Sequence, residues 1–139
     1  MKDCTKYLAK ALVAAIKTKT GLPCWTKVPK GDDGNPTAIP YIYISGISNN
    51  EDGPKCAFHY VYSLNIEIVY AGLYDKLTLW NTVDEVKNIF SERVPFLLEG
   101  NFEIMTTRLV SGSEREDLFG SIDVDVATLV IEFLIEDNN

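Results

Sequence analysis

The sequence predicts an α+β domain, an antiparallel β-sheet with two main helices packed on one face. Two segments, residues 4–20 and 76–92, repeat apolar residues at the helical period. Two others, residues 58–70 and 121–137, alternate apolar and polar residues as strands do. The order is helix, a few strands, helix and two long strands, and the length of 139 residues predicts one domain spanning 1–139.

The first predicted helix, residues 4–20, is amphipathic and has clear end signals. Its apolar face carries Leu8, Leu12, Ala15 and Ile16, and a second face carries Lys6, Lys10 and Lys17. Gly21 suits the left-handed cap position, and Pro23 prevents continuation.

The next segments predict three strands separated by polar loops. A short strand is expected near 24–28, then a loop at 29–36, and then a strand after Pro40 in YIYISGI. A second loop is expected at 48–55. In the following strand the even positions from Phe58 to Tyr70 are apolar, which places His59, the one histidine of the chain, on the more polar side.

The second half of the chain predicts a helix and two strands. Asp75 is a candidate N-cap for a helix over 76–92, and Pro95 is expected to end it. Its predicted buried stripe consists of Leu77, Trp80, Val83, Val86 and Phe90. A strand near 101–111, a charged loop at 112–120 and a strand at 121–137 follow. The apolar phase changes within this last strand, which predicts a β-bulge.

Charge is distributed unevenly along the chain. The net charge is −7, yet residues 1–31 carry seven lysines against one acidic residue. Residues 114–139 carry eight acidic residues against one arginine. Such opposed ends can pair within the fold or between copies of it.

No pattern in the sequence marks a catalytic, cofactor or metal site, and none is expected. Three cysteines without C-x-x-C spacing argue against a disulfide framework or a zinc site. His59 has no marked nucleophile partner, and the glycines form no nucleotide-binding motif. Asp123 and Asp125 share a strand face and could hold a hard cation, although a solvated strand looks the same. No apolar run is long enough to span a membrane, and residues 1–25 are interpreted as containing a helix of a cytoplasmic protein and not a signal peptide.

The layout resembles that of the tail-terminator, or tail-completion, and head–tail joining proteins of long-tailed bacteriophages. The similar features run over residues 5–136: a helix ending near GLP, the strand IPYIYISG, the strand YVYSLNIEIVYAG and the helix DKLTLWNTVDEVKNIF. The strand and charged segment NFEIMTTRLVSGSERED and the strand SIDVDVATLVIEFLI then close the chain. The resemblance implies a structural subunit of a ring, commonly a hexamer. Such a ring caps the tail tube or joins it to the neck and lets DNA pass.

These observations lead to one main hypothesis and two alternatives. The main hypothesis is a homo-oligomeric ring in the virion tail or neck, assembled in the host cytoplasm, with tail-tube and connector proteins as partners and DNA passing without specific binding. The expected subunit contacts are Lys6, Lys10, Lys17, Glu51, Asp52, Arg108, Glu114, Arg115, Glu116 and Asp117. The first alternative is a small-molecule enzyme or binding domain using His59, Tyr60, Glu67 and the Asp123/Asp125 pair. The second is an acidic adaptor that binds a basic partner.

Overall fold

The computed structural model describes residues 4–27, 39–52, 59–72, 76–119 and 122–138, without the side chains of 50–52, 119 and 122. It contains two helices and five strands. In chain order they are α1 (Thr5–Thr20), β1 (Cys24–Trp25), β2 (Tyr41–Asp52), β3 (His59–Ala71), α2 (Leu77–Ile89), β4 (Phe102–Phe119) and β5 (Ile122–Asp137).

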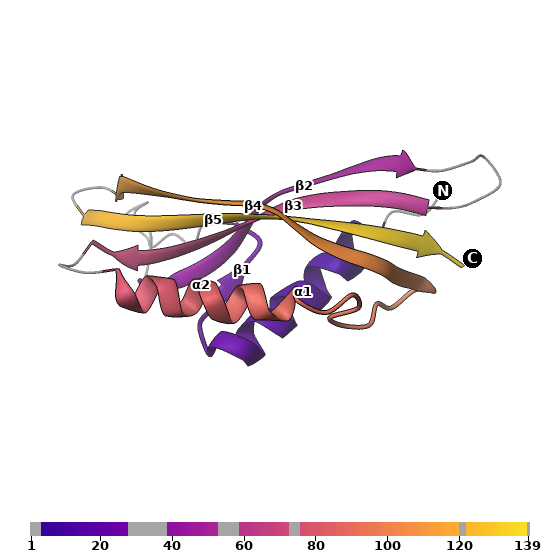
Figure 1. Ribbon diagram of the computed structural model, residues 1–139, viewed down its shortest axis with the longest axis horizontal. Coiled ribbons are helices and arrows are strands. Elements are labelled where there is room, and N and C mark those ends of the chain that lie inside the picture. The colour runs from indigo at the N-terminus through magenta and orange to yellow at the C-terminus, as the bar shows by residue number, and fades with distance from the viewer. Residues whose placement is uncertain (1–3, 28–38, 53–58, 73–75, 120–121, 139) are drawn as a thin grey trace.

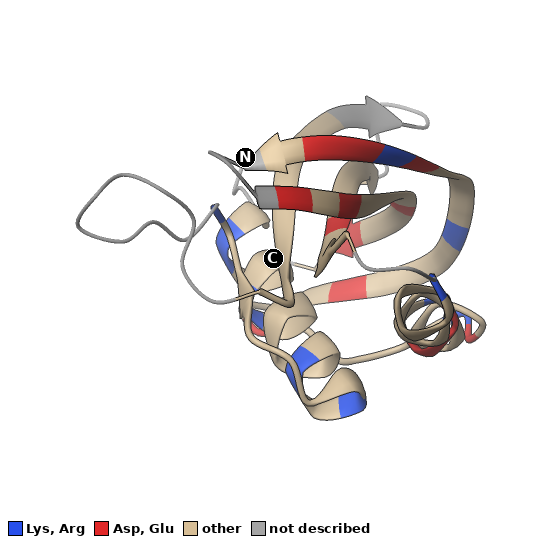
Figure 2. Ribbon diagram, turned by 90° about the vertical axis from the view of Figure 1, so that its left-hand side faces the viewer, with Lys and Arg blue, Asp and Glu red and all other residues tan. Residues whose placement is uncertain are grey.

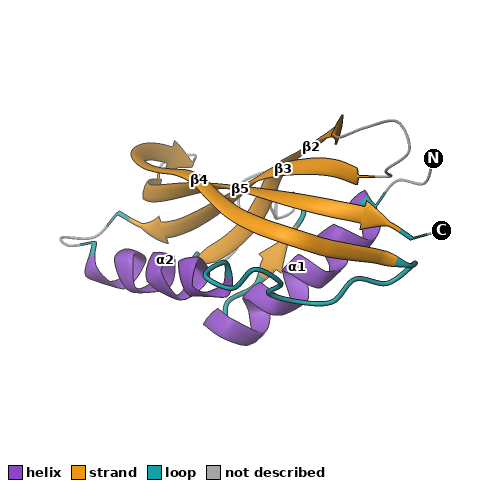
Figure 3. Ribbon diagram, turned by 45° about the vertical axis from the view of Figure 1, so that its right-hand side comes forward, coloured by secondary structure: helices purple, strands orange, loops and turns teal. Residues whose placement is uncertain are grey.

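The strands form one sheet in the order β1-β2-β3-β5-β4 (Figure 1). The four long strands pair with one another in antiparallel fashion, while the short β1 runs parallel to β2. Both helices cover the same face of the sheet (Figure 3). The predicted α+β class with helices on one face is therefore confirmed, and β1 makes the sheet mixed.

The main core lies between the helices and the sheet. The even positions of β3 from Tyr60 to Ile68 face the helices, as the alternation predicts. The odd positions of β5 from Ala127 to Ile135 lie beside them. From the helices, the core receives Leu8, Leu12, Ile16, Leu79, Val83 and Val86, followed by Phe90. Alternation is preserved because a one-residue slip would turn every apolar side chain toward solvent.

A second, smaller core explains the phase change in the last strand. Tyr41, Val69, Val124 and Val126 are buried on the opposite face of the sheet. Both faces of β5 are therefore covered from Val124 to Ala127. The predicted bulge in this strand is wrong, because the pairing of β3 with β5 is continuous from end to end.

The irregular registers lie in the outer strands instead. The β4–β5 pairing shifts between Ile104 and Thr106 and again between Leu109 and Ser111. The β2–β3 pairing shifts between Ile44 and Gly46. Each shift inserts one extra residue into the outer strand, where fewer neighbouring strands fix the backbone.

Two predicted loops are mostly strand. Residues 48–52 belong to β2, and residues 112–119 belong to β4, which continues eight residues beyond Ser111. Both segments are rich in turn-forming and charged residues, which are compatible with strands at the solvated ends of hairpins. Here the cross-strand pairing with β3 and β5 outweighs local propensity.

The boundaries of the two helices lie close to the predicted ones. The first helix matches its prediction, and Gly21 caps it with φ 73° and a hydrogen bond from its N–H to the carbonyl of Lys17. The second begins at Leu77 with Lys76 as N-cap, while Asp75 lies outside the described residues. It ends at Ile89, before Pro95. Its buried stripe contains Leu79 and Thr82, and Leu77 and Trp80 are exposed, so the prediction for these two residues is wrong.

Candidate assembly surface

The lysines predicted to contact another subunit lie along α1. Lys6 is exposed, with its ammonium group 5.8 Å from the centre of the Tyr7 ring. Lys10 forms an ion pair with Glu99 at 3.3 Å, so part of its charge is balanced within the chain. Lys17 is exposed in the last turn, where the helix dipole favours a cation.

The acidic residues predicted on the second loop belong to β2. The backbones of Glu51 and Asp52 pair with Tyr60 and His59 of β3. The side chains of Glu51 and Asp52 lie outside the described residues.

The remaining predicted contact residues lie on β4, which is an edge strand. Among the described residues, β4 pairs with β5 alone. Every residue from Arg108 to Leu118 is exposed. Long exposed edges are templates for pairing with another chain, and proteins cover or charge them. In Figure 2 the β4–β5 hairpin carries most of its charged positions as acidic residues, with arginine among them, and the lysine positions of α1 lie on a separate part of the ribbon.

Arg115 and Glu67 connect this edge strand to the middle of the sheet. Arg115 donates from Nη2 to Oε1 of Glu67 at 2.8 Å and from Nη1 to the Thr128 hydroxyl at 3.2 Å. Asp117 lies 3.6 Å from the Arg115 Nε. The register places Thr128 directly between the two strands, opposite Glu67 on β3. The guanidinium therefore crosses β5 on the face opposite the helices.

Electrostatics keep this pair ionised. Burial acts to raise the pKa of the Glu67 carboxyl, but hydrogen bonds from Tyr43, Arg115 and Ser45, with the charge of Arg115, lower it overall. The same hydrogen bond to Glu67 raises the pKa of Arg115. Burial, together with Glu67, raises the pKa of Tyr43. The tyrosine therefore stays a hydrogen-bond donor.

On the helix side of β4, Glu114 holds the start of α2. The indole N–H of Trp80 donates to Oε1 of Glu114 at 2.6 Å. The Lys76 ammonium lies 3.8 Å from Oε2 of the same carboxylate. The two contacts fix α2 against the edge strand and leave Trp80 46% exposed.

Exposed apolar side chains concentrate on the same two elements. Of the six large exposed hydrophobic residues in the described ranges, five belong to α2 and β4. They are Leu77, Trp80, Leu109, Val110 and Leu118.

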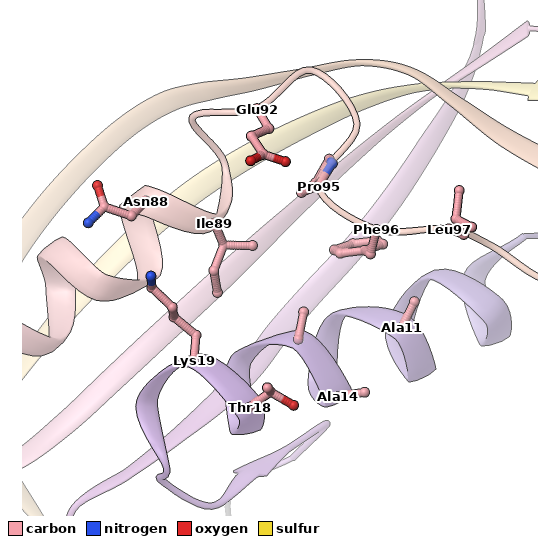
Figure 4. A pocket seen from close by; sticks show the side chains of 11 residues that line it. Ala11, Ala14, Thr18, Lys19, Asn88, Ile89, Glu92, Pro95, Phe96 and Leu97 are labelled. Atoms are coloured by element: carbon pink, nitrogen blue, oxygen red, sulfur yellow. The ribbon is translucent and has the colours of Figure 1, made fainter.

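The sixth, Leu97, borders an open groove of about 650 Å³. Figure 4 shows Ala11 and Ala14 of α1 on one side of this groove. Ile89, at the end of α2, and Phe96 and Leu97 beyond it face them from the other side. Small side chains make the α1 wall low, because alanine contributes only a methyl group.

The residues of the small-molecule alternative are not brought together. His59 lies at one end of β3, 4.0 Å from Glu136, and Glu67 is eight positions along the same strand, roughly 26 Å away. Asp125 is buried with the helix-facing residues, whereas Glu67 is on the opposite face. Within the described ranges no group of three metal-ligating side chains gathers. No described helix is long and apolar enough to span a membrane.

Comparison with solved structures identifies where this fold occurs. The chain superposes on a protein of the virion of a native gene transfer agent (GTA) particle with a TM-score of 0.75, over 98% of this chain and 99% of that one. This fold occurs in a virion. The two sequences are 15% identical, so the likeness establishes the fold alone.

A second solved structure gives a TM-score of 0.52 at 18% identity, covering 93% of this chain and 92% of that one. No protein-family model and no curated protein matches the sequence.

Sequence reasoning missed several residues of this surface. Glu99, Leu97 and Leu118 stand out only by exposure and position in the fold. The helical spacing wrongly assigns Trp80 to the core. The sequence does indicate that Glu67 needs a partner. A carboxylate between Ile66 and Ile68 in a mostly apolar strand is expected to be partly buried, and a buried carboxylate requires a cationic or hydrogen-bonding partner.

Proposed function

We propose that this chain is a structural subunit of a phage-like virion, where it forms a ring that caps the tail tube or joins the tail to the head. The observation that carries the proposal is the superposition on a virion protein over almost the whole of both chains. The resemblance of the sequence layout to tail-completion proteins supports the same role.

Ring formation requires each copy to present two different surfaces, one for each neighbour. The exposed edge of β4 and the apolar side chains of α2 and β4 supply a candidate for one of them. The predicted contact residues Arg108, Glu114, Arg115, Glu116 and Asp117 lie on that edge. A hexamer is the expected size.

The proposed partners are the tail-tube protein on one side of the ring and a neck or connector protein on the other. The net charge of −7 suits a channel for DNA, since repulsion of the phosphate backbone prevents adhesion. DNA therefore passes without specific binding, and the work of the subunit is assembly rather than catalysis.

Size-exclusion chromatography with light scattering, followed by negative-stain microscopy, tests the proposal. The purified chain is measured alone and after co-expression with the tail-tube protein from the same genome. We expect a ring-shaped oligomer in at least one of the two samples. A monomer in both would overturn the proposal.

A further inference from the structure

A cavity with an acidic lining lies between the β4–β5 hairpin and the start of α2. Its volume is about 330 Å³, and we name it the acidic cavity. Its lining includes Gly72, Lys76, Glu116, Asp117, Asp123 and Asp125. Four acidic residues and one lysine therefore border a single space.

Asp125 distinguishes this cavity from an ordinary solvated acidic surface. The residue is only 6% exposed, and its carboxylate has no hydrogen bond or ion pair within the described part of the chain. The carboxylate oxygens are not sealed in the interior, so they open onto the spaces that the residue lines. These are the acidic cavity and a second cavity beside Thr78 and Leu79 of α2. A buried carboxylate without such partners is costly, and a bound cation removes that cost.

Two further carboxylates lie beside Asp125 and are not balanced within the chain. Glu116 is directly opposite Asp125 in the β4–β5 register, so their Cβ atoms are about 5 Å apart on one face of the hairpin. Asp123 precedes Asp125 by two residues on β5, about 7 Å along the same face. Glu116 and Asp123 are exposed, and neither forms an ion pair with a described residue.

The other charged residues of the lining already have partners. The Lys76 ammonium lies 3.8 Å from Oε2 of Glu114, which is outside the lining. Oδ2 of Asp117 lies 3.6 Å from Nε of Arg115, and its Oδ1 accepts a hydrogen bond from the N–H of Leu118. The three carboxylates described above therefore remain as an unbalanced negative charge.

The spacing of these carboxylates favours an organic cation over a metal ion. A metal ion holds its oxygen ligands within about 2.0–2.6 Å of one point. Among the described residues, no three metal-ligating side chains converge in this way. The carboxylates of the cavity are instead spread along two strands. An ammonium group donates up to three hydrogen bonds, and a flexible amine chain can follow carboxylates that are several ångströms apart.

We propose that the acidic cavity binds a primary ammonium group, with Asp125 as its buried partner and Glu116 and Asp123 at the rim. A free polyamine and a lysine of a second copy present this same group. On this chain Lys6 and Lys17 are exposed on one face of α1 and have no ion pair with a described residue. The inference goes beyond the proposed function and does not need a ring, because one copy contains the whole site.

Thermal melting of the purified chain with spermidine at low ionic strength tests the site. We expect saturating spermidine to raise the melting temperature by about 3 °C or more. Asp125→Asn, which keeps the side-chain shape, and the double variant Glu116→Gln/Asp123→Asn should each lose most of this rise. Asp84→Asn, which removes an exposed carboxylate of α2 outside the cavity, is the matched control and should keep it.

Two kinds of result would overturn the proposal. The first is no rise, or a rise that persists in both cavity variants. The second is an equal rise with sodium chloride of the same ionic strength or with magnesium chloride, because that reflects general screening of a chain with net charge −7. None of these results bears on the proposed function, which ring formation tests separately.

Light scattering then identifies the source of the ammonium group. If a lysine of a second copy supplies it, self-association should weaken on the order of tenfold or more in the cavity variants and in Lys6→Gln/Lys17→Gln. Spermidine should then compete with self-association. If a free amine supplies it, self-association should be the same in all of these variants. Both results support the site, and they differ only in what occupies it.

Discussion

Arg115 on the edge strand β4 reaches across β5 and binds Glu67 on β3, with Nη2 and Oε1 2.8 Å apart. The Glu67 side chain is 8% exposed and that of Arg115 is 45% exposed. This contact joins the edge strand to the centre of the sheet through side chains, in addition to the backbone pairing of β4 with β5. The outer hairpin is thereby held to the sheet on the face opposite the helices.

Replacing Arg115 with methionine should lower the free energy of unfolding by about 2 kcal/mol. The cause is the Glu67 carboxylate, which stays buried after its cationic partner is removed. Partial exposure of Arg115 keeps the loss below that of a fully buried pair. Urea unfolding followed by tryptophan fluorescence measures the change.

Arg108→Met is the matched control for this prediction. Arg108 pairs with Glu132 at 3.1 Å on the same two strands, but its side chain is 68% exposed. Such surface pairs contribute on the order of 0.5 kcal/mol or less. Equal losses for the two variants would contradict the special role assigned to Arg115.

The stability of the protein should fall in acid through Glu67. Its pKa in the folded state lies below the ordinary value of 4.5, so the unfolded chain takes up this proton first as pH decreases. The stabilisation is fully present above that ordinary value and is lost as pH falls through the lowered one. Urea unfolding at a series of pH values should show a steeper acid decline for the unmodified chain than for Glu67→Gln. Parallel curves would refute the prediction.

Two glycines with positive φ should respond differently to alanine. Gly21 has φ 73° and no atom within 4 Å of the place where a Cβ would lie, whereas Gly100 has φ 74° and its Cβ would lie 3.0 Å from the Tyr7 ring. Gly21→Ala should cost about 1 kcal/mol from backbone strain. Gly100→Ala should cost about 2 kcal/mol or more, because crowding adds to the same strain. Thermal melting of both variants checks the order, and an equal effect would exclude crowding by Tyr7.

The thiol of Cys24 should resist modification in the folded protein. Burial raises its pKa to about 11, which outweighs the lowering effect of Lys17, so almost no reactive thiolate forms at neutral pH. Cys4 is also fully buried. In a Cys56→Ser variant, a thiol reagent such as Ellman's reagent should label neither cysteine until denaturant is added. Rapid labelling under native conditions would show that α1 or β1 opens readily.

The periodicity of the sequence predicted most of the fold. The alternation in β3 and the helical spacing in α1 correctly predicted these elements, because each pattern buries one continuous apolar face.

The contact residues proposed from charge remain predictions. The structure places Lys10, Arg108, Glu114, Arg115 and Asp117 in ion pairs within the chain, which the sequence does not reveal.

The sequence by itself determined where the apolar faces lie, since burial of such a face depends on local spacing. It determined the helices, the long central strands and the opposed charges of the two ends. Only the tertiary structure decided that residues 112–119 extend an edge strand, that β5 is covered on both faces near Val126, and that Trp80 points outward. Each of these depends on contacts between segments distant in sequence, and local propensity is too weak to fix them.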